Sequence, residues 1–218
     1  MMRVRKIVFS TSVKSNLYGR IVRNFCQDTV VEDRHSPPRS KQFYEDNATL
    51  RNYFYFMDNR GQLFLEETKR RNFTSCMKDK KFLDFTIRNM KPNNTGKFLE
   101  MDSISLCGKE INYIAHADRL SPFTFQKKKT DDESESGPVL CYAGTLSQPY
   151  RPELLAFHPD TGRVYHLITK HKHYKGRYGL LHPHLCMEIG DSIVHDDSAD
   201  RYVFTDHDGV SYPLDVFN

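Results

Sequence analysis

Three turns of one design constrain the fold of this 218-residue chain most strongly. Their shared pattern is Phe-x-[Asp/Pro]-x-x-Gly-x-x-[Phe/Tyr], and it occurs at residues 56–64, 157–165 and 204–212. Glycine adopts the left-handed backbone that such a tight turn requires, and aromatic residues favour the flanking strands. We therefore expect three antiparallel hairpins. The unequal spacing of the three copies argues against a solenoid of regular repeats.

The first part of the chain combines hairpins with one helix. The aromatic-rich stretch at 53–65, "YFYFMDNRGQLFL", predicts a hairpin. Asp79 is placed to cap a helix that Pro92 and the Asn-Asn-Thr-Gly turn at 93–96 would end. The apolar side of that helix would hold Phe82, Leu83, Ile87 and Met90. Further strands are expected around 98–114 and 123–125.

Two polar stretches separate the expected structural units. Residues 28–50 read as a disordered linker, and residues 127–138, "KKKTDDESESGP", as a solvated charged loop. Between them, residues 51–126 form an expected N-terminal α+β half. Residues 139–218 predict a second, β-rich half with strands at short intervals. The sequence thus predicts an α+β protein of mainly antiparallel hairpins, with one or two helices in two small halves.

Residues 1–27 have the composition of a mitochondrial transit peptide. They contain six basic residues and no acid before Asp28, and they lack the continuous apolar stretch of a secretory signal. Arg23 stands three residues before Cys26, a spacing typical of matrix-peptidase cleavage. We expect a protein of the mitochondrial matrix; a disordered basic tail is the alternative. Removing this segment leaves a nearly neutral chain without the clustered basic face of a nucleic-acid binder.

Composition and motifs exclude several classes of function. No run of 18 or more apolar residues is present, so we expect a soluble protein without a membrane span. The five cysteines form no CxxC pair, and in the matrix we expect reduced thiols. Phosphate-binding, dinucleotide-binding, zinc-protease and serine-hydrolase motifs are all missing.

A candidate binding face lies in residues 104–114, "ISLCGKEINYI". Gly108 and Lys109 fit a two-residue type II′ turn, which places alternate residues on opposite faces. The polar face then holds Ser105, Cys107, Glu110 and Asn112. Three interpretations stay open: a structural hairpin, a surface for a ligand or partner, and a site with a nucleophilic cysteine. Glu110 disfavours the third, because a neighbouring carboxylate suppresses the reactive thiolate.

The histidines suggest a second candidate, a metal site. Eight of the ten lie between residues 158 and 207, including His171-x-His173 and His182-x-His184-x-Cys186. Alternate residues of a strand could ligate one zinc ion. However, the first pair stands in a basic, loop-like stretch, and Pro183 interrupts the second. We therefore predict no metal site and interpret these histidines as turn or surface residues.

Several motifs in order resemble the uncharacterised protein family 0598, a mitochondrial domain of unknown function. They are "NYFYFMDNRGQLFLEETKRRNFTSCMKDKKFLDF", "SLCGKEIN", "FTF", "LCYAG" and "TGRVYH", between Asn52 and Ile189. This family has no established activity, so the resemblance implies no catalytic residues, but it supports a mitochondrial location. Asp118, Phe123 and Phe125 also resemble a bacterial family of two small α+β halves suspected of ligand binding.

The predicted function is therefore non-catalytic binding of a small ligand or a mitochondrial protein partner. The ligand-binding candidates are Ser105, Cys107, Glu110 and Asn112, with no catalytic residue and no identified cofactor. An enzyme using Cys107 or a histidine-bound metal is one alternative. An assembly factor or subunit of a mitochondrial complex is another.

Overall fold

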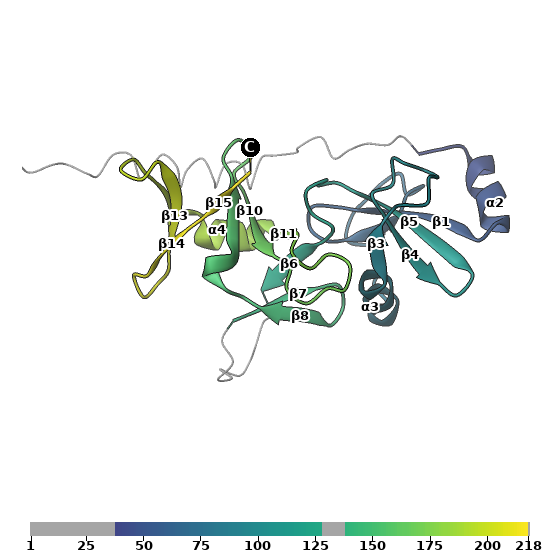
Figure 1. Ribbon diagram of the computed structural model, residues 1–218. Coiled ribbons are helices and arrows are strands. Elements are labelled where there is room, and N and C mark those ends of the chain that lie inside the picture. The colour runs from purple at the N-terminus through teal and green to yellow at the C-terminus, as the bar shows by residue number, and fades with distance from the viewer. Residues whose placement is uncertain (1–37, 128–137, 218) are drawn as a thin grey trace, which may run out of the picture.

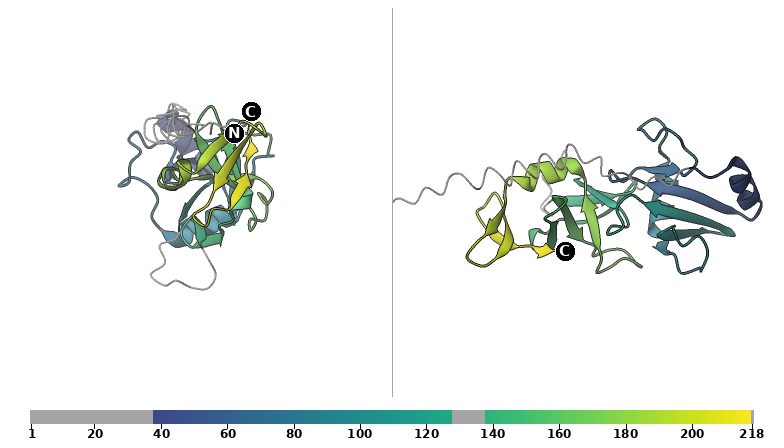
Figure 2. Two further views of the ribbon diagram at one scale, coloured as in Figure 1. Left: turned by 90° about the vertical axis from the view of Figure 1, so that its left-hand side faces the viewer. Right: turned by 90° about the horizontal axis from the view of Figure 1, so that it is seen from above.

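The computed structural model describes residues 38–127 and 138–217. The predicted transit peptide at 1–27, the linker up to residue 37 and most of the charged loop lie outside these described residues. Within them, three α-helices and three β-sheets confirm the predicted α+β class. The sheets follow one another along an elongated molecule, with the five-stranded sheet at one end and the three-stranded sheet at the other (Figures 1 and 2).

The first sheet combines the two predicted hairpins of the N-terminal half. Its strands are β1 (Asn52–Met57), β2 (Leu63–Leu65), β3 (Met90–Pro92), β4 (Ser103–Cys107) and β5 (Glu110–His116), in the spatial order β2-β1-β5-β4-β3. Strands β1 and β2 form one antiparallel hairpin, and β4 and β5 form the other. Strand β1 also pairs in parallel with β5, with Tyr55 opposite Ile114. Turn signals do not predict this contact, because it joins segments far apart in the sequence.

Helix α2 (Lys41–Thr49) lies at the outer end of this sheet beside β1 (Figure 1), and its aromatic side chains contact Phe54 on one face. The Ser40 hydroxyl caps it by accepting a hydrogen bond from the Phe43 amide at 3.1 Å. The ring of Phe43 lies 5.0 Å from that of Phe54, centroid to centroid. The prediction of a disordered linker up to residue 50 is therefore wrong for this stretch, because its aromatic side chains are anchored on the sheet.

Helix α3 (Lys80–Arg88) lies against the opposite face of the sheet. Asp79 caps it as predicted, with its carboxylate accepting a hydrogen bond from the Phe82 amide at 2.8 Å. The helix ends before Met90, which the apolar pattern placed on it. Met90 instead lies opposite Ser105 in the β3–β4 pairing, so it belongs to the sheet and not to the helix. Among the described helices, none is long and apolar enough to cross a membrane.

Short strands dominate residues 139–217, as predicted, but the strand at Thr124–Lys127, which the sequence assigned to the first half, belongs to the same sheet. A seven-stranded sheet has the order β15-β9-β10-β11-β6-β7-β8, and a three-stranded sheet has the order β12-β13-β14. Their bounds are β6 (Thr124–Lys127), β7 (Val139–Tyr142), β8 (Leu146–Pro149), β9 (Leu155–His158), β10 (Arg163–Leu167), β11 (Tyr178–Leu181), β12 (Ile193–Asp196), β13 (Arg201–Thr205), β14 (Ser211–Pro213) and β15 (Asp215–Val216). A 3₁₀ turn, η1 (Pro152–Leu154), and helix α4 (Pro183–Gly190) add to the predicted strands.

The three turns of common design adopt one backbone solution. Gly61, Gly162 and Gly209 have φ values of 74°, 65° and 79°, the left-handed region that glycine tolerates best. Asp58 and Asp206 stand at the same position of the first and third turns. Each carboxylate accepts two backbone N–H hydrogen bonds from residues of its own turn. The predicted hairpins β1–β2, β9–β10 and β13–β14 are thus confirmed.

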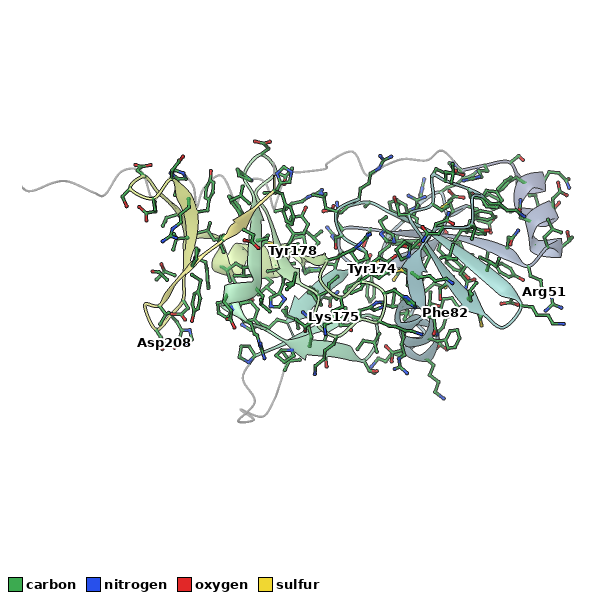
Figure 3. All side chains as sticks on the ribbon, in the orientation of Figure 1. Arg51, Phe82, Tyr174, Lys175, Tyr178 and Asp208 are labelled. Carbon is green, nitrogen blue, oxygen red and sulfur yellow. The ribbon has the colours of Figure 1, made fainter. Side chains whose placement is uncertain are left out.

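One apolar core extends through both halves of the described chain. It contains Ile87 and Ile114 from the first half together with Leu140 and Leu181 from the second. Tyr174 lies at the junction (Figure 3), where its hydroxyl is 2.5 Å from the buried hydroxyl of Ser103. The two halves are therefore packed against each other.

The β7–β8 turn fastens the second half to helix α3. Thr145 donates hydrogen bonds from its amide, at 2.7 Å, and from its hydroxyl to the carboxylate of Asp84. At Gly144, a Cβ atom would lie 2.9 Å from the carbonyl oxygen of Lys80. A larger residue would push the turn away from the helix. This close approach gives the glycine of the "LCYAG" motif a structural role.

Candidate functional site

The β4–β5 hairpin has the predicted register. Ser105 lies opposite Asn112, and Cys107 lies opposite Glu110. Gly108 has a φ of 59°, and Lys109 is not among the residues with positive φ, as a type II′ turn requires. Because side chains alternate across a strand, the four predicted site residues share one face of the sheet. The structure thus brings together the residues that the sequence placed together.

The rest of the chain covers the inner half of that face. Ser105 is fully buried and Asn112 is 2% exposed, and helix α3 contacts strand β4. The Ser105 hydroxyl has no hydrogen-bond partner among the described residues, and neither has that of Thr86 on α3. Cys107 and Glu110 are half-buried near the tip of the hairpin. Ligand binding by the four residues stays a prediction.

Tyr55 lies on the same face, on the neighbouring strand β1. The pKa of its phenol depends on the charges nearby. Burial raises the pKa of its phenol, and the negative charge of Glu110 raises it further. The face is therefore weakly acidic at its outer end. Tyr55 lines a shallow cavity together with Tyr53 and Phe54, but none of the four predicted site residues does.

Two histidines of the predicted metal alternative, His171 and His182, have structural roles. Nε2 of His171 donates to the carbonyl oxygen of Ile87 at 2.7 Å, and Nδ1 accepts from the amide of His173 at 3.2 Å. Burial lowers the pKa of His171 and favours this neutral form. The His182 side chain caps helix α4. In residues 38–127 and 138–217, no three His, Cys, Asp or Glu side chains are grouped so that they could hold a metal ion.

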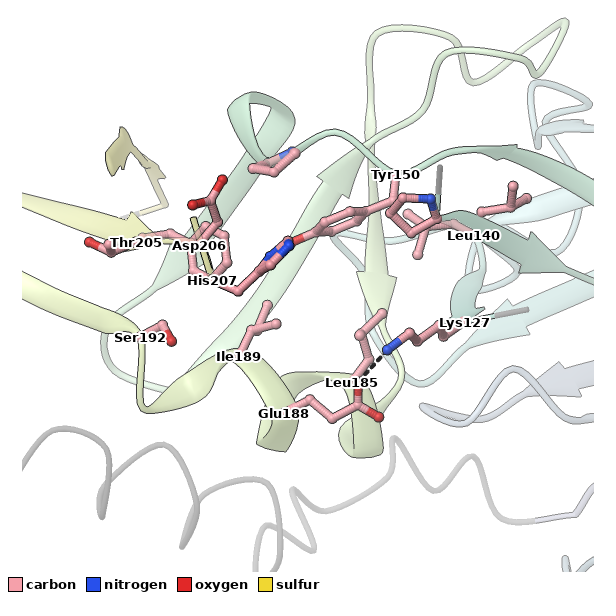
Figure 4. Close-up of a pocket in the computed structure, with 14 residues that line it drawn as sticks. Lys127, Leu140, Tyr150, Leu185, Glu188, Ile189, Ser192, Thr205, Asp206 and His207 are labelled. Carbon is pink, nitrogen blue, oxygen red and sulfur yellow. Dashed lines mark hydrogen bonds and ion pairs between the residues drawn. The ribbon is translucent and has the colours of Figure 1, made fainter. Parts of the chain in front are cut away.

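A different site is formed by segments of the second half. Helix α4, strand β7 and the β13–β14 hairpin enclose a cavity of about 660 Å³, which we call the α4 pocket (Figure 4). Its walls are the side chains of Lys127, Pro138, Val139, Leu140, Tyr150, Pro152, Leu185, Glu188, Ile189, Ser192, Phe204, Thr205, Asp206 and His207. Most of them are apolar or aromatic. Ligand cavities in proteins are typically about 300–1,000 Å³ and mainly apolar.

Local sequence explains why α4 presents its apolar side to the cavity. His182 caps the helix, and Pro183 stands at its first position, where a missing amide proton costs no hydrogen bond. Leu185, Glu188 and Ile189 have the spacing i, i+3 and i+4, which brings them to one side of a helix. Glu188 at the rim forms an ion pair with Lys127 at 3.1 Å.

Tyr150 supplies the most distinctive polar group of the pocket. Its hydroxyl is buried and has no hydrogen-bond partner among the described residues. Burial, reinforced by the negative charge of Asp206, raises the pKa of the phenol to about 12, so the hydroxyl is neutral at physiological pH. A neutral phenol can both donate and accept a hydrogen bond. An unused hydroxyl at an apolar cavity is suited to orient a ligand.

The sequence analysis did not identify the α4 pocket, because its walls come from segments spread over 127–207. One signal was available: apolar residues 185 and 189 follow a capping residue and a proline, which is typical of a short amphipathic helix. The turn at 206–209 was recognised, but only the packed fold shows that Asp206 lines a cavity. Tyr150 has no sequence signal of its own.

Comparison with known proteins gives a family but no function. No solved structure matches this chain. The family number and the mitochondrial location that the resemblance implied stay predictions. The family match extends over nearly all of the described residues and includes every wall of the α4 pocket. Residues 42–216 match the family described as "Domain of unknown function (DUF4505)", and the chain therefore belongs to that family.

Proposed function

We propose that this protein binds a small, largely apolar ligand in the α4 pocket, without catalysing a reaction, and that it does so in the mitochondrial matrix. The observation that supports binding is the 660 Å³ cavity with apolar walls and an unpartnered, buried tyrosine hydroxyl. The described residues leave the pocket partly open, so a ligand can enter.

The location rests on the sequence of residues 1–27, which is basic and free of acids. If the proposal is right, protein recovered from mitochondria begins near residue 26. N-terminal sequencing of tagged protein from fractionated cells tests this. Recovery from the cytosol with Met1 intact would contradict the proposed location and leave the proposal about the pocket standing.

Ligand binding is tested with a neutral apolar dye, N-phenyl-1-naphthylamine, whose fluorescence rises in apolar surroundings. We expect saturable enhancement with the full chain and loss of most of it in Ile189→Phe, because the larger ring fills the cavity. Met187→Phe is the matched control, since Met187 belongs to the same helix but does not line the pocket. Thermal unfolding of both variants shows that they are folded.

Two results would overturn the binding proposal. The wild-type chain could fail to bind the dye saturably at any accessible concentration. Alternatively, Ile189→Phe and Met187→Phe could bind it equally well, which would place the dye elsewhere on the surface.

A further inference from the structure

The polar walls of the α4 pocket lie at opposite ends of its apolar middle. Figure 4 shows Lys127 and Glu188 together at one end, with Asp206 and His207 at the other. Leu185 and Ile189 lie between these ends, and Leu140 lies on the wall near Lys127. A ligand that fills the cavity would therefore contact apolar side chains along its length and charged groups at its termini.

Asp206 is held rigidly at its end of the cavity. Its Oδ1 accepts hydrogen bonds from the amides of Asp208 at 3.0 Å and Val210 at 2.8 Å, and its Oδ2 accepts one from the Tyr212 hydroxyl at 3.1 Å. Burial alone would raise the pKa of Asp206, but these hydrogen bonds outweigh it and lower the pKa. The carboxylate is thus ionised at neutral pH, and Oδ2 retains capacity for another donor.

No lysine or arginine among the described residues forms an ion pair with Asp206. Lys127 pairs with Glu188 at the far end. His207 is mostly exposed, and its Nε2 lies 3.4 Å from Asp208. Among the lining side chains, Lys127 carries a positive charge, and Glu188 and Asp206 carry negative charges. The pocket therefore has a net negative charge that is concentrated near Asp206.

The Tyr150 hydroxyl lies under the influence of this carboxylate and has unused lone pairs. A protonated amine carries several N–H donors and a positive charge, so it can bond to both oxygens and pair with Asp206. Aromatic rings also attract cations, and Tyr150 and Phe204 both line the cavity. A carboxylate ligand would instead be repelled by Asp206.

We propose that the ligand of the α4 pocket is an amphipathic amine, with its apolar body against Leu140, Leu185 and Ile189 and its protonated nitrogen at the Asp206 end. This inference rests on the proposed binding function and specifies its ligand class. It predicts that charge, and not only apolar area, selects the ligand. Asp206 is then the residue that determines specificity, and Tyr150 is the second acceptor.

The test compares three probes with the same alkyl chain: n-octylamine, octanoate and 1-octanol. Each competes with N-phenyl-1-naphthylamine for the full chain at pH 7 and low ionic strength. We expect octylamine to bind about tenfold or more tightly than octanoate, with octanol between them, because the two charged probes differ in their interaction with Asp206. High salt should reduce the difference.

Asp206→Asn identifies the origin of the preference. Asparagine keeps the turn acceptor and the size of the side chain but removes its charge, so the tenfold preference should fall to about twofold. Asp58→Asn is the matched control. Asp58 accepts backbone hydrogen bonds in the equivalent turn of the first half, at 2.9 and 2.7 Å, but it does not line the pocket. This variant should keep the full preference.

The two proposals fail in different ways. If all three probes displace the dye equally, or octanoate displaces it best, the amine class is wrong and the binding function stands. If Asp206→Asn and Asp58→Asn change the preference alike, the assignment to Asp206 is wrong. If the dye and octanol do not bind at all, the binding function itself is wrong.

Discussion

The β4–β5 hairpin and the α4 pocket both place a buried hydroxyl beside apolar side chains, but only the pocket is left open. At the hairpin, helix α3 packs over the sheet, and Ser105 is fully buried. At the pocket, Tyr150 lines a cavity of about 660 Å³, and its buried hydroxyl has no partner among the described residues. A polar cluster in the sequence therefore does not by itself distinguish a binding face from a packed interface. Whether such a cluster can bind a ligand depends on which helices and strands the fold packs over it.

The largest difference between the two regions should appear when an isoleucine is shortened. Ile87 on α3 is 2% exposed in the common core, so Ile87→Ala should lower the free energy of unfolding by about 3 kcal/mol. Ile189 already borders a cavity, so Ile189→Ala should cost only about 1 kcal/mol, because fewer packing contacts are lost. Urea unfolding followed by far-UV circular dichroism measures both values. Equal losses would show that the pocket is closed in solution.

A pH titration should separate the same two regions through their histidines. His171 links the two halves through its hydrogen bond to the carbonyl oxygen of Ile87. Burial lowers the pKa of His171 below the usual 6.5. The unfolded chain then takes up the proton first, so stability is fully present above about pH 6.5 and is lost as the pH falls below it. His171→Asn should reduce this slope, and at pH 7 it should cost about 1 kcal/mol for the lost hydrogen bonds.

His207 at the pocket rim is the comparison for this titration, because its side chain is 89% exposed. His207→Asn should leave the stability at pH 7 unchanged, because the exposed side chain makes little packing contact. The slope should not vanish in His171→Asn, since burial also lowers the pKa values of His166 and His182. An unaltered slope in His171→Asn would mean that the junction is not held by a neutral His171.

Local signals predict the hairpins of this protein well. The register from Ile104 to Tyr113 follows from a two-residue turn and strict alternation, and the three glycine turns follow from one backbone requirement. Helix α2 is missed because a polar stretch gains its stability from two aromatic contacts with the sheet. These contacts are made only when the sheet is present.

The candidate sites also combine features that local sequence predicts with features that only tertiary packing determines. Alternation along two strands predicts that Ser105 and Asn112 share a face, but not that helix α3 packs on the same sheet. The α4 pocket depends on how strand β7, helix α4 and hairpin β13–β14 pack together, and its walls are far apart in sequence. Parallel pairs such as β6 with β11 fix these positions, and no local turn specifies them.

The smallest expected effect compares the two hydroxyls directly. Neither Ser105 nor Tyr150 has a hydrogen-bond partner for its hydroxyl, so Ser105→Ala and Tyr150→Phe should each change the free energy of unfolding by less than about 1 kcal/mol. Binding should distinguish them. Tyr150→Phe should weaken the binding of octylamine about fivefold, the worth of one hydrogen bond, whereas Ser105→Ala should leave it unchanged. Competition against the neutral dye measures both, and a weaker amine affinity in Ser105→Ala would move the binding site to the hairpin.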